Sequence, residues 1–170
     1  MNKAKKLKRT LFKLIVDLKQ NHREFLVNPN SDFTRFRKLN FDTVIKMILL
    51  MGAGSLKDEL YSWFGLKCDN PSSSALIQQR SKICPDAFKW LFDEFNGKTS
   101  IKKTYKNLVL LAVDGSEILI SHDPKDKKTY IPKLDKNKIP CKGYNSYHLH
   151  AAFDILEHTY FDVELQGQRE

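Results

Sequence analysis

Apolar residues in the first half of the chain recur every three or four positions, which is the spacing of one helix face. Leu7, Leu11, Leu14, Ile15 and Leu18 follow this spacing with lysines between them, and predict a first helix. Further helices are predicted over residues 41–51, 55–65, 72–83 and 85–95. Serines stand at the start of two of these segments, and glycines lie at the end of three of them or within two residues after it, as expected at helix caps. Residues 1–97 are therefore predicted to be helical, without a sheet.

The pattern changes after Gly97, where the helical spacing gives way to short apolar runs. Residues 98–107 are polar and basic, and predict a linker. Residues 108–113, 117–121 and 147–155 predict strands, and alternation over residues 160–165 indicates one more. Residues 122–145 are rich in Lys, Asp, Pro and Gly, which predicts a long exposed loop. The expected fold class is α+β, with an incomplete antiparallel sheet over residues 108–170.

Asp114 is the most informative single residue, because it follows an unbroken apolar run, LVLLAV, over residues 108–113. Such a run predicts a strand that is buried on both faces. A carboxylate beside it is costly unless it is solvated, paired or bound to a cation. Carboxylates at strand ends commonly hold Mg²⁺ for chemistry on phosphates. The alternative is that Asp114 and Gly115 form a hairpin turn leading into a second strand.

The charge of the chain points to a polyanionic partner. The formal net charge is +9, and residues 1–30 contain eight Lys or Arg against two acidic residues. A second basic stretch covers residues 125–142. Nucleic acid is the first expectation for the partner, and an anionic membrane surface is the alternative. Because no apolar stretch is long enough to span a bilayer and no signal peptide is visible, we expect no membrane insertion and a cytoplasmic location. The three cysteines include no Cys-x-x-Cys pair, so neither a zinc site nor a disulfide framework is expected.

Residues 55–65 and 72–83 resemble a helix-turn-helix in outline, although the loop between them is longer than usual. Glutamine side chains can pair with adenine edges and arginine side chains with guanine edges in the major groove of DNA. The alternative is an ordinary solvated helix face. The candidate DNA-binding residues on the second helix are Ser73, Ser74, Gln78, Gln79, Arg80 and Lys82.

Four stretches, taken in order, resemble one protein family. They are FRKLNF at residues 36–41, SSALIQQRSKI followed by PDAF at 73–88, LAVDGS at 111–116, and YNSYHLHAAFDI followed by YFD at 144–162. Their content and order are similar to the DDE transposases of bacterial insertion sequences, specifically the group with a helical N-terminal region and an RNase H-like catalytic core. The resemblance covers most of the chain.

The resemblance implies an enzyme that cuts and rejoins DNA with two divalent metal ions, Mg²⁺ or Mn²⁺, held by two Asp and one Glu. Asp114 matches the first of these three residues, and is therefore the expected catalytic and metal-binding residue. The resemblance also implies that the helical region binds double-stranded DNA at the ends of the mobile element. A homo-oligomer, or a mixed oligomer with a full-length transposase, is a further expected partner.

The chain also departs from the family pattern. The second Asp normally follows a later strand, and the Glu lies in a still later helix. Asp154 and Asp162 come too early for the second Asp, and Glu170 is terminal. We therefore expect the N-terminal part of a transposase with a truncated RNase H-like core, which is catalytically incomplete as it stands; whether the chain acts as an enzyme is left open.

Three hypotheses about function remain. The chain is a transposase fragment that binds element-end DNA, a non-catalytic DNA-binding protein that regulates or inhibits transposition, or a helical interaction protein with a basic surface. Sequence-specific DNA binding separates the first two from the third. An acidic motif further downstream separates the first from the second.

Overall fold

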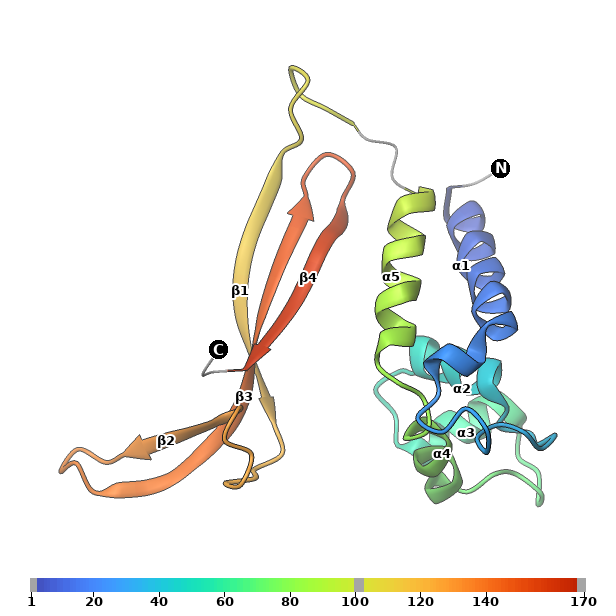
Figure 1. Cartoon of the computed structure of the whole chain (residues 1–170), viewed down its shortest axis with the longest axis horizontal. Helices are drawn as coiled ribbons and strands as arrows, with labels where there is room; N and C mark the ends of the chain where they lie inside the picture. Colours follow the sequence, from blue (N-terminus) through green and yellow to red (C-terminus); the bar gives the residue numbers. More distant parts are fainter. Residues whose placement is uncertain (1–2, 100–102, 168–170) are drawn as a thin grey trace. The chain divides into compact units, whose positions relative to one another are not determined.

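The computed structural model describes residues 3–99 and 103–167, and the chain divides into two compact units, Met1–Thr99 and Ser100–Glu170. We call them the helical unit and the sheet unit. The described residues form five α-helices in the first unit and a four-stranded antiparallel sheet in the second (Figure 1). The fold class is therefore α+β, as predicted. Residues 168–170, including Glu170, and residues 100–102 of the predicted linker lie outside the described residues.

Side-chain caps begin α2 (Phe41–Leu50) and α3 (Leu56–Phe64) in the first unit. The serine cap of α3 is predicted from the sequence, and the Asn40 cap of α2 is not. Asn40 accepts a hydrogen bond from the Thr43 amide before α2, and Ser55 forms a capping box with Asp58 before α3. The helices are α1 (Lys3–Gln20), α2 (Phe41–Leu50), α3 (Leu56–Phe64), α4 (Ser73–Arg80) and α5 (Asp86–Thr99), with a short 3₁₀ helix η1 (His22–Phe25) after α1.

Two helix ends differ from the prediction. The helix predicted to stop at Asn96 and Gly97 continues through both residues to Thr99. These residues lower helix propensity by only about 1 kcal/mol each, and the Thr99 hydroxyl donates to the Phe95 carbonyl in the last turn. The helix predicted to reach Ile83 ends at Arg80, because the backbone at Leu26 and Ile83 forms an isolated antiparallel bridge instead.

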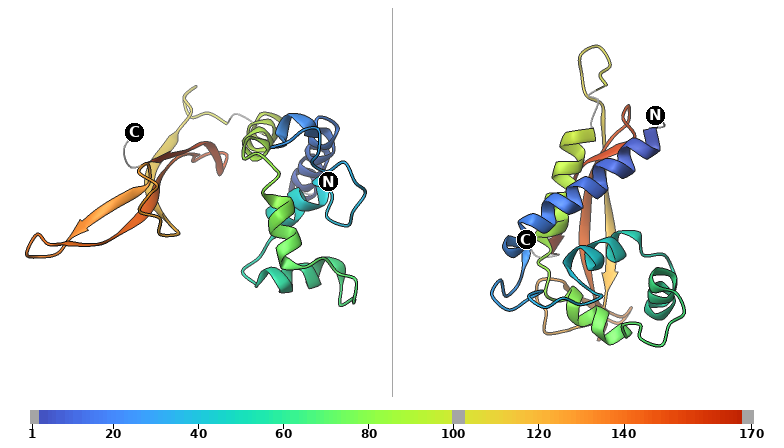
Figure 2. Two further views of the ribbon diagram at one scale, coloured as in Figure 1. Left: turned by 60° about the horizontal axis from the view of Figure 1, so that its bottom comes forward. Right: turned by 90° about the vertical axis from the view of Figure 1, so that its right-hand side faces the viewer.

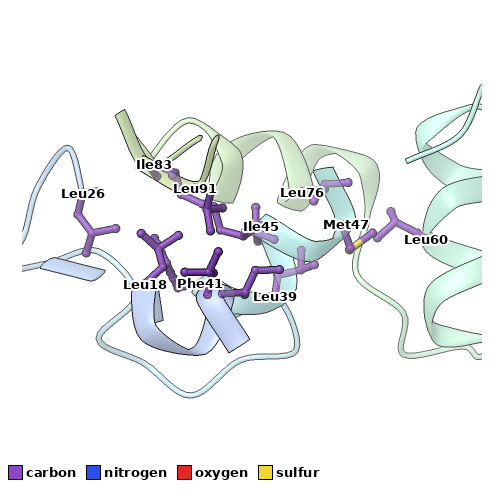
Figure 3. Packing of buried hydrophobic residues seen from close by; sticks show 14 residues of the cluster. Leu18, Leu26, Leu39, Phe41, Ile45, Met47, Leu60, Leu76, Ile83 and Leu91 are labelled. Atoms are coloured by element: carbon purple, nitrogen blue, oxygen red, sulfur yellow. The ribbon is translucent and has the colours of Figure 1, made fainter. Parts of the chain in front are cut away.

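One apolar cluster joins the five helices of this unit. Leu18 of α1, Ile45 of α2 and Leu91 of α5 lie in its centre, and Leu60 and Leu76 bring α3 and α4 to its far end (Figure 3). Burial of a side chain of this size stabilises the folded state by about 1.5–3 kcal/mol. Contacts between α1 and α5 close the cluster on the other side (Figure 2). The core therefore fixes where α4 lies, although α4 itself has only eight residues.

Asp42 links α1 to α2 through charge. Its carboxylate lies 2.9 Å from the ammonium of Lys19 on α1 and 2.9 Å from that of Lys46 on its own helix. Burial raises the pKa of Asp42, but the hydrogen bonds and charges of the two lysines lower it by more, so it lies below its ordinary value. Since the Asp42 side chain is only 16% exposed, this ion pair is screened less by water than an ordinary surface pair.

All pairing in the sheet involves one strand, β3 (Pro140–Asp154). Asn145 of β3 lies opposite both Ile120 of β1 (Leu111–Ile120) and Tyr130 of β2 (Tyr130–Leu134). A strand residue has one neighbour on each side, so β1 and β2 lie on opposite edges of β3. The fourth strand, β4 (Thr159–Gly167), pairs with the second half of β3. The first half of β3 and β2 extend as a two-stranded ribbon (Figure 1).

The strand predictions around Asp114 are wrong in two respects. Residues 111–113 and 117–120 belong to one continuous strand, β1, so Asp114 and Gly115 lie in the middle of a strand rather than at its end or in a turn. The reason is β3, which pairs with every residue of β1 without a break and holds it extended. All of β1 is exposed rather than buried on both faces, because the described part of its own unit contains a single sheet and no helix.

The segment predicted as a long loop, residues 122–145, is also partly wrong, since it contains β2 and the beginning of β3. Polar side chains hold this part of the sheet. Asn145 is 1% exposed; its side-chain carbonyl accepts from the Asp123 amide, and its NH₂ group donates to the Asp123 carbonyl and the Thr129 hydroxyl. In the described part of the sheet unit, no large apolar side chain is buried, and the buried side chains are polar.

We predict that Asp42→Asn destabilises the helical unit by about 1–3 kcal/mol, because it removes a part-buried charge that two lysines contact. Because the pKa of Asp42 is lowered on folding, its contribution to the free energy of unfolding is present above about pH 4. This contribution is lost as the pH falls through the lowered pKa. Thermal unfolding followed by tryptophan fluorescence measures this unit alone, because both tryptophans, Trp63 and Trp90, lie in it.

Asp93→Asn is the matched control, because Asp93 forms an ion pair with Lys89 on the exposed surface of α5. We expect it to change stability by less than about 0.5 kcal/mol. Equal effects of the two substitutions, or an unchanged loss of stability in acid for Asp42→Asn, would contradict the role assigned to Asp42.

Candidate nucleic-acid interface and carboxylate site

Helix α4 presents part of the predicted DNA-binding set to solvent. Ser72 caps it by accepting from the Ala75 amide, and Leu76 anchors it in the core. Ser74, Gln78 and Arg80 are exposed. Ser73 and Arg80 are seven positions apart, so these two lie on one side of the helix, and Ser73 is half-buried. No ion pair reaches Arg80 from the part of the chain that the structure describes.

Two members of the predicted set lie elsewhere. Gln79 is buried, with 7% of its surface exposed, so its side chain does not share the exposed face of α4. Lys82 follows the end of α4, is half-buried, and lies 3.8 Å from the Asp32 carboxylate. A side chain that reads a base must project into solvent from the face of the helix that enters the groove, and neither Gln79 nor Lys82 does so. The loop between α3 and α4 covers residues 65–72, which is longer than the three or four residues of a helix-turn-helix.

The β2–β3 ribbon carries much of the second basic stretch noted in the sequence, but the prediction of a loop there missed that these residues form paired strands. Asp135 shapes its tip by accepting from the amides of Asn137 and Ile139, both at 2.8 Å. No ion pair to the lysines of the ribbon is found among the described residues. A two-stranded ribbon is narrow enough to enter the major groove of DNA. The exposed lysines are Lys133, Lys136, Lys138 and Lys142.

Asp114 lies on an apolar face of the sheet. It is opposite Ala151 of β3, which in turn is opposite Val163 of β4, so these three side chains share one face. This face lines a hollow of 570 Å³ to which Leu149, Phe153 and Tyr160 also contribute. Asp114 is the only acidic side chain that lines this hollow among the described residues. Its Oδ1 accepts from the Gly115 amide at 2.9 Å.

The other acidic residues considered as metal ligands lie away from Asp114. Asp162 is opposite Ala152, the neighbour of Ala151, so it lies on the other face of the sheet. Asp154 is 6% exposed and shapes the turn to β4, where its Oδ1 accepts from the amides of Leu156 and Glu157. Within residues 3–99 and 103–167 there is no group of three His, Cys, Asp or Glu that could hold a metal. The described residues therefore offer one carboxylate at the expected metal site.

Comparisons with protein-family models, with curated proteins and with solved structures each gave no match. Among the described residues, no helix is both long enough and apolar enough to cross a bilayer. The assignment of function therefore rests on the chemistry of the exposed basic residues and of Asp114.

We predict that Asn145→Ala releases the base of the ribbon, because it removes the three hydrogen bonds that hold residues 123 and 129 against β3. The expected cost is about 2–4 kcal/mol, at roughly 1 kcal/mol for each bond. Hydrogen exchange of the backbone amides of β2 should accelerate accordingly. Asn137→Ala, at the exposed tip of the ribbon, is the control and should leave exchange near Thr129 unchanged. Slow exchange of β2 in Asn145→Ala would refute this account.

Proposed function

We propose that the chain binds double-stranded DNA in the manner of a DDE transposase, with the helical unit on element-end DNA and the sheet unit as the first strands of an RNase H-like core. The observation that carries the proposal is the placement of Asp114. It lies on β1, the first strand of an antiparallel array in which β3 pairs with β1 and β4. This agrees with the resemblance, which gives the first metal-binding carboxylate to the first strand of that core. The protein then acts on DNA in the cytoplasm.

The charge distribution supports DNA as the partner. Arg80 on α4 and the four ribbon lysines are exposed, and none is neutralised by an ion pair from a described residue. Cations that are free of internal partners can displace the counterions of DNA phosphates. This release of counterions is the main source of affinity for DNA. Arg80 and Gln78 are the exposed α4 residues that can pair with base edges. Gln79 and Lys82 do not belong to the base-reading set, because Gln79 is buried and Lys82 is half-buried.

Asp114 can act as a ligand but does not form a metal centre alone. Divalent metals at such a site would activate a water or a 3′-hydroxyl for attack on a phosphodiester. The Gly115 amide binds Oδ1 of Asp114 and leaves its other oxygen available. Mg²⁺ held by one carboxylate keeps most of its water shell and binds weakly. The described residues therefore do not fit a two-metal centre by themselves.

A non-catalytic DNA-binding regulator of transposition is the second candidate function. It is favoured by one observation, the apolar surroundings of Asp114, where no second described carboxylate lies. Such a protein would compete for element ends, or form mixed oligomers with a full-length transposase.

We predict that Arg80→Ala reduces discrimination between DNA sequences by about 1–3 kcal/mol, the value of a bidentate contact with guanine. Lys5→Ala should instead weaken binding to all sequences alike, because Lys5 is an exposed cation of α1 and not one of the α4 residues proposed to pair with base edges. Competition between specific and random duplexes, repeated at several salt concentrations, separates the two effects. Unchanged discrimination in Arg80→Ala would remove α4 as the reading element.

We predict that the 170-residue chain does not nick element-end duplex with Mg²⁺ or Mn²⁺, because the described residues supply one carboxylate where several are needed. Asp114→Asn should leave duplex binding nearly unchanged, since the substitution keeps the shape of the side chain. The assay follows nicked product on a denaturing gel, with Asp114→Asn as the matched control. Metal-dependent nicking that disappears in Asp114→Asn would show that further ligands complete the site, and would exclude the non-catalytic alternative.

A further inference from the structure

A polar cavity of 320 Å³ lies in the helical unit between the segment that precedes α2 and the end of α4. Its volume falls within the range of small-molecule sites, about 300–1,000 Å³. Polar and charged side chains form most of its wall, namely Ser31, Thr34, Arg35, Arg37, Gln79 and Lys82. The cavity is therefore unlike the apolar hollow beside Asp114. It belongs neither to the exposed face of α4 nor to the β2–β3 ribbon.

The charge of the cavity is positive. Arg35, Arg37 and Lys82 all line it, and no Asp or Glu does. Asp32 is buried and does not line the cavity. One of its carboxylate oxygens lies 3.8 Å from Nζ of Lys82, and the other accepts a hydrogen bond from the Asn28 amide. No ion pair to Arg35 or Arg37 is found within the described residues. Two guanidinium groups without a protein carboxylate favour a bound oxyanion, and phosphate is the oxyanion whose geometry they match in bidentate pairs.

Gln79 supplies a second, independent indication of a ligand. Its side chain is 7% exposed and lines the cavity, and no hydrogen bond to its amide group is found within the described residues. Neither atom of this amide is among the fully buried polar atoms without a partner in the described part of the chain, so the amide faces the water of the cavity and is open to a ligand. A ligand with a donor and an acceptor side by side would satisfy both ends of this amide, as an adenine edge does. The half-buried ring of Phe33 lies in the same wall and offers a surface for stacking.

We propose that this cavity binds a nucleotide, with its phosphate on Arg35, Arg37 and Lys82 and its base edge on Gln79. The site is distinct from the proposed contacts of α4 with duplex DNA, because Gln79 and Lys82 are not on the exposed face that includes Gln78. The nucleotide has two sources, a free mononucleotide or the 5′-phosphorylated terminal nucleotide of a DNA strand. Both present the same phosphate and base to the cavity.

Calorimetric titration of the full chain with deoxyadenosine monophosphate, deoxyadenosine and inorganic phosphate tests the proposal. We expect the monophosphate to bind about tenfold more tightly than either other compound, because only it engages both the arginines and Gln79. The double substitution Arg35→Ala/Arg37→Ala should weaken the monophosphate by about tenfold or more. Gln79→Met, which keeps the volume, should weaken the monophosphate but not inorganic phosphate. Equal binding of the monophosphate and deoxyadenosine would overturn the proposal, and so would equal binding of the monophosphate and phosphate.

Two controls keep the result specific. Arg80→Ala should leave binding of the monophosphate unchanged, so that a failure of the duplex-DNA proposal and a failure of this one are distinguishable. Tryptophan fluorescence confirms that each variant is folded, and a folded Arg35→Ala/Arg37→Ala variant that binds like wild type would overturn the site. A short single strand with and without a 5′-phosphate separates the two sources. A terminal nucleotide in the cavity makes the phosphorylated strand bind more tightly than the same strand without the phosphate, whereas a site for the free mononucleotide makes the two strands bind alike.

Discussion

Backbone pairing with β3 is the constraint on which the whole sheet unit depends. The other three strands hydrogen-bond to β3 and not to one another. The described part of this unit buries no large apolar side chain, so the ladders and the polar contacts of Asn145 replace the core that usually supports a sheet. The position of Asp114, the reach of the basic ribbon and the direction of β4 are therefore all consequences of one strand.

The helical unit follows the opposite principle, because its apolar cluster determines where the functional side chains lie. Leu76 turns one side of α4 into the core and leaves Gln78 and Arg80 in solvent. Since the bridge between Leu26 and Ile83 ties the chain beyond α4 to the residues after η1, the segment over residues 31–39 passes beside Gln79. The polar cavity forms where this segment passes, so the same packing that exposes Arg80 also buries Gln79.

The sequence predicts what depends on neighbouring residues and misses what depends on distant ones. The starts of α2 and α3 are predicted correctly because they depend on nearby residues: helical apolar spacing begins at Phe41, and Ser55 bonds the amide three residues away. The continuity of β1 is missed, because β3 holds it extended through Asp114 and Gly115 from a distant part of the chain. The apolar run before Asp114 predicts burial, but exposure depends on what covers the strand. The burial of Gln79 is not predictable from the sequence, because α4 has eight residues and its polar and apolar side chains are not separated onto two faces.

The central place of β3 also has a consequence for the time course of folding. The β3–β4 hairpin closes through a short connection, residues 155–158, and such hairpins form within about 1–10 microseconds. β1 precedes β3 in the chain and is separated from it by β2 and two connections, so it pairs only after a much larger loop has closed. On the ribosome, β1 emerges first, with its apolar side chains exposed and both edges unpaired, the state in which strands of different chains associate. The strand that is synthesised first must therefore wait for its partner, and the nascent chain is most vulnerable to aggregation between the emergence of β1 and that of β3.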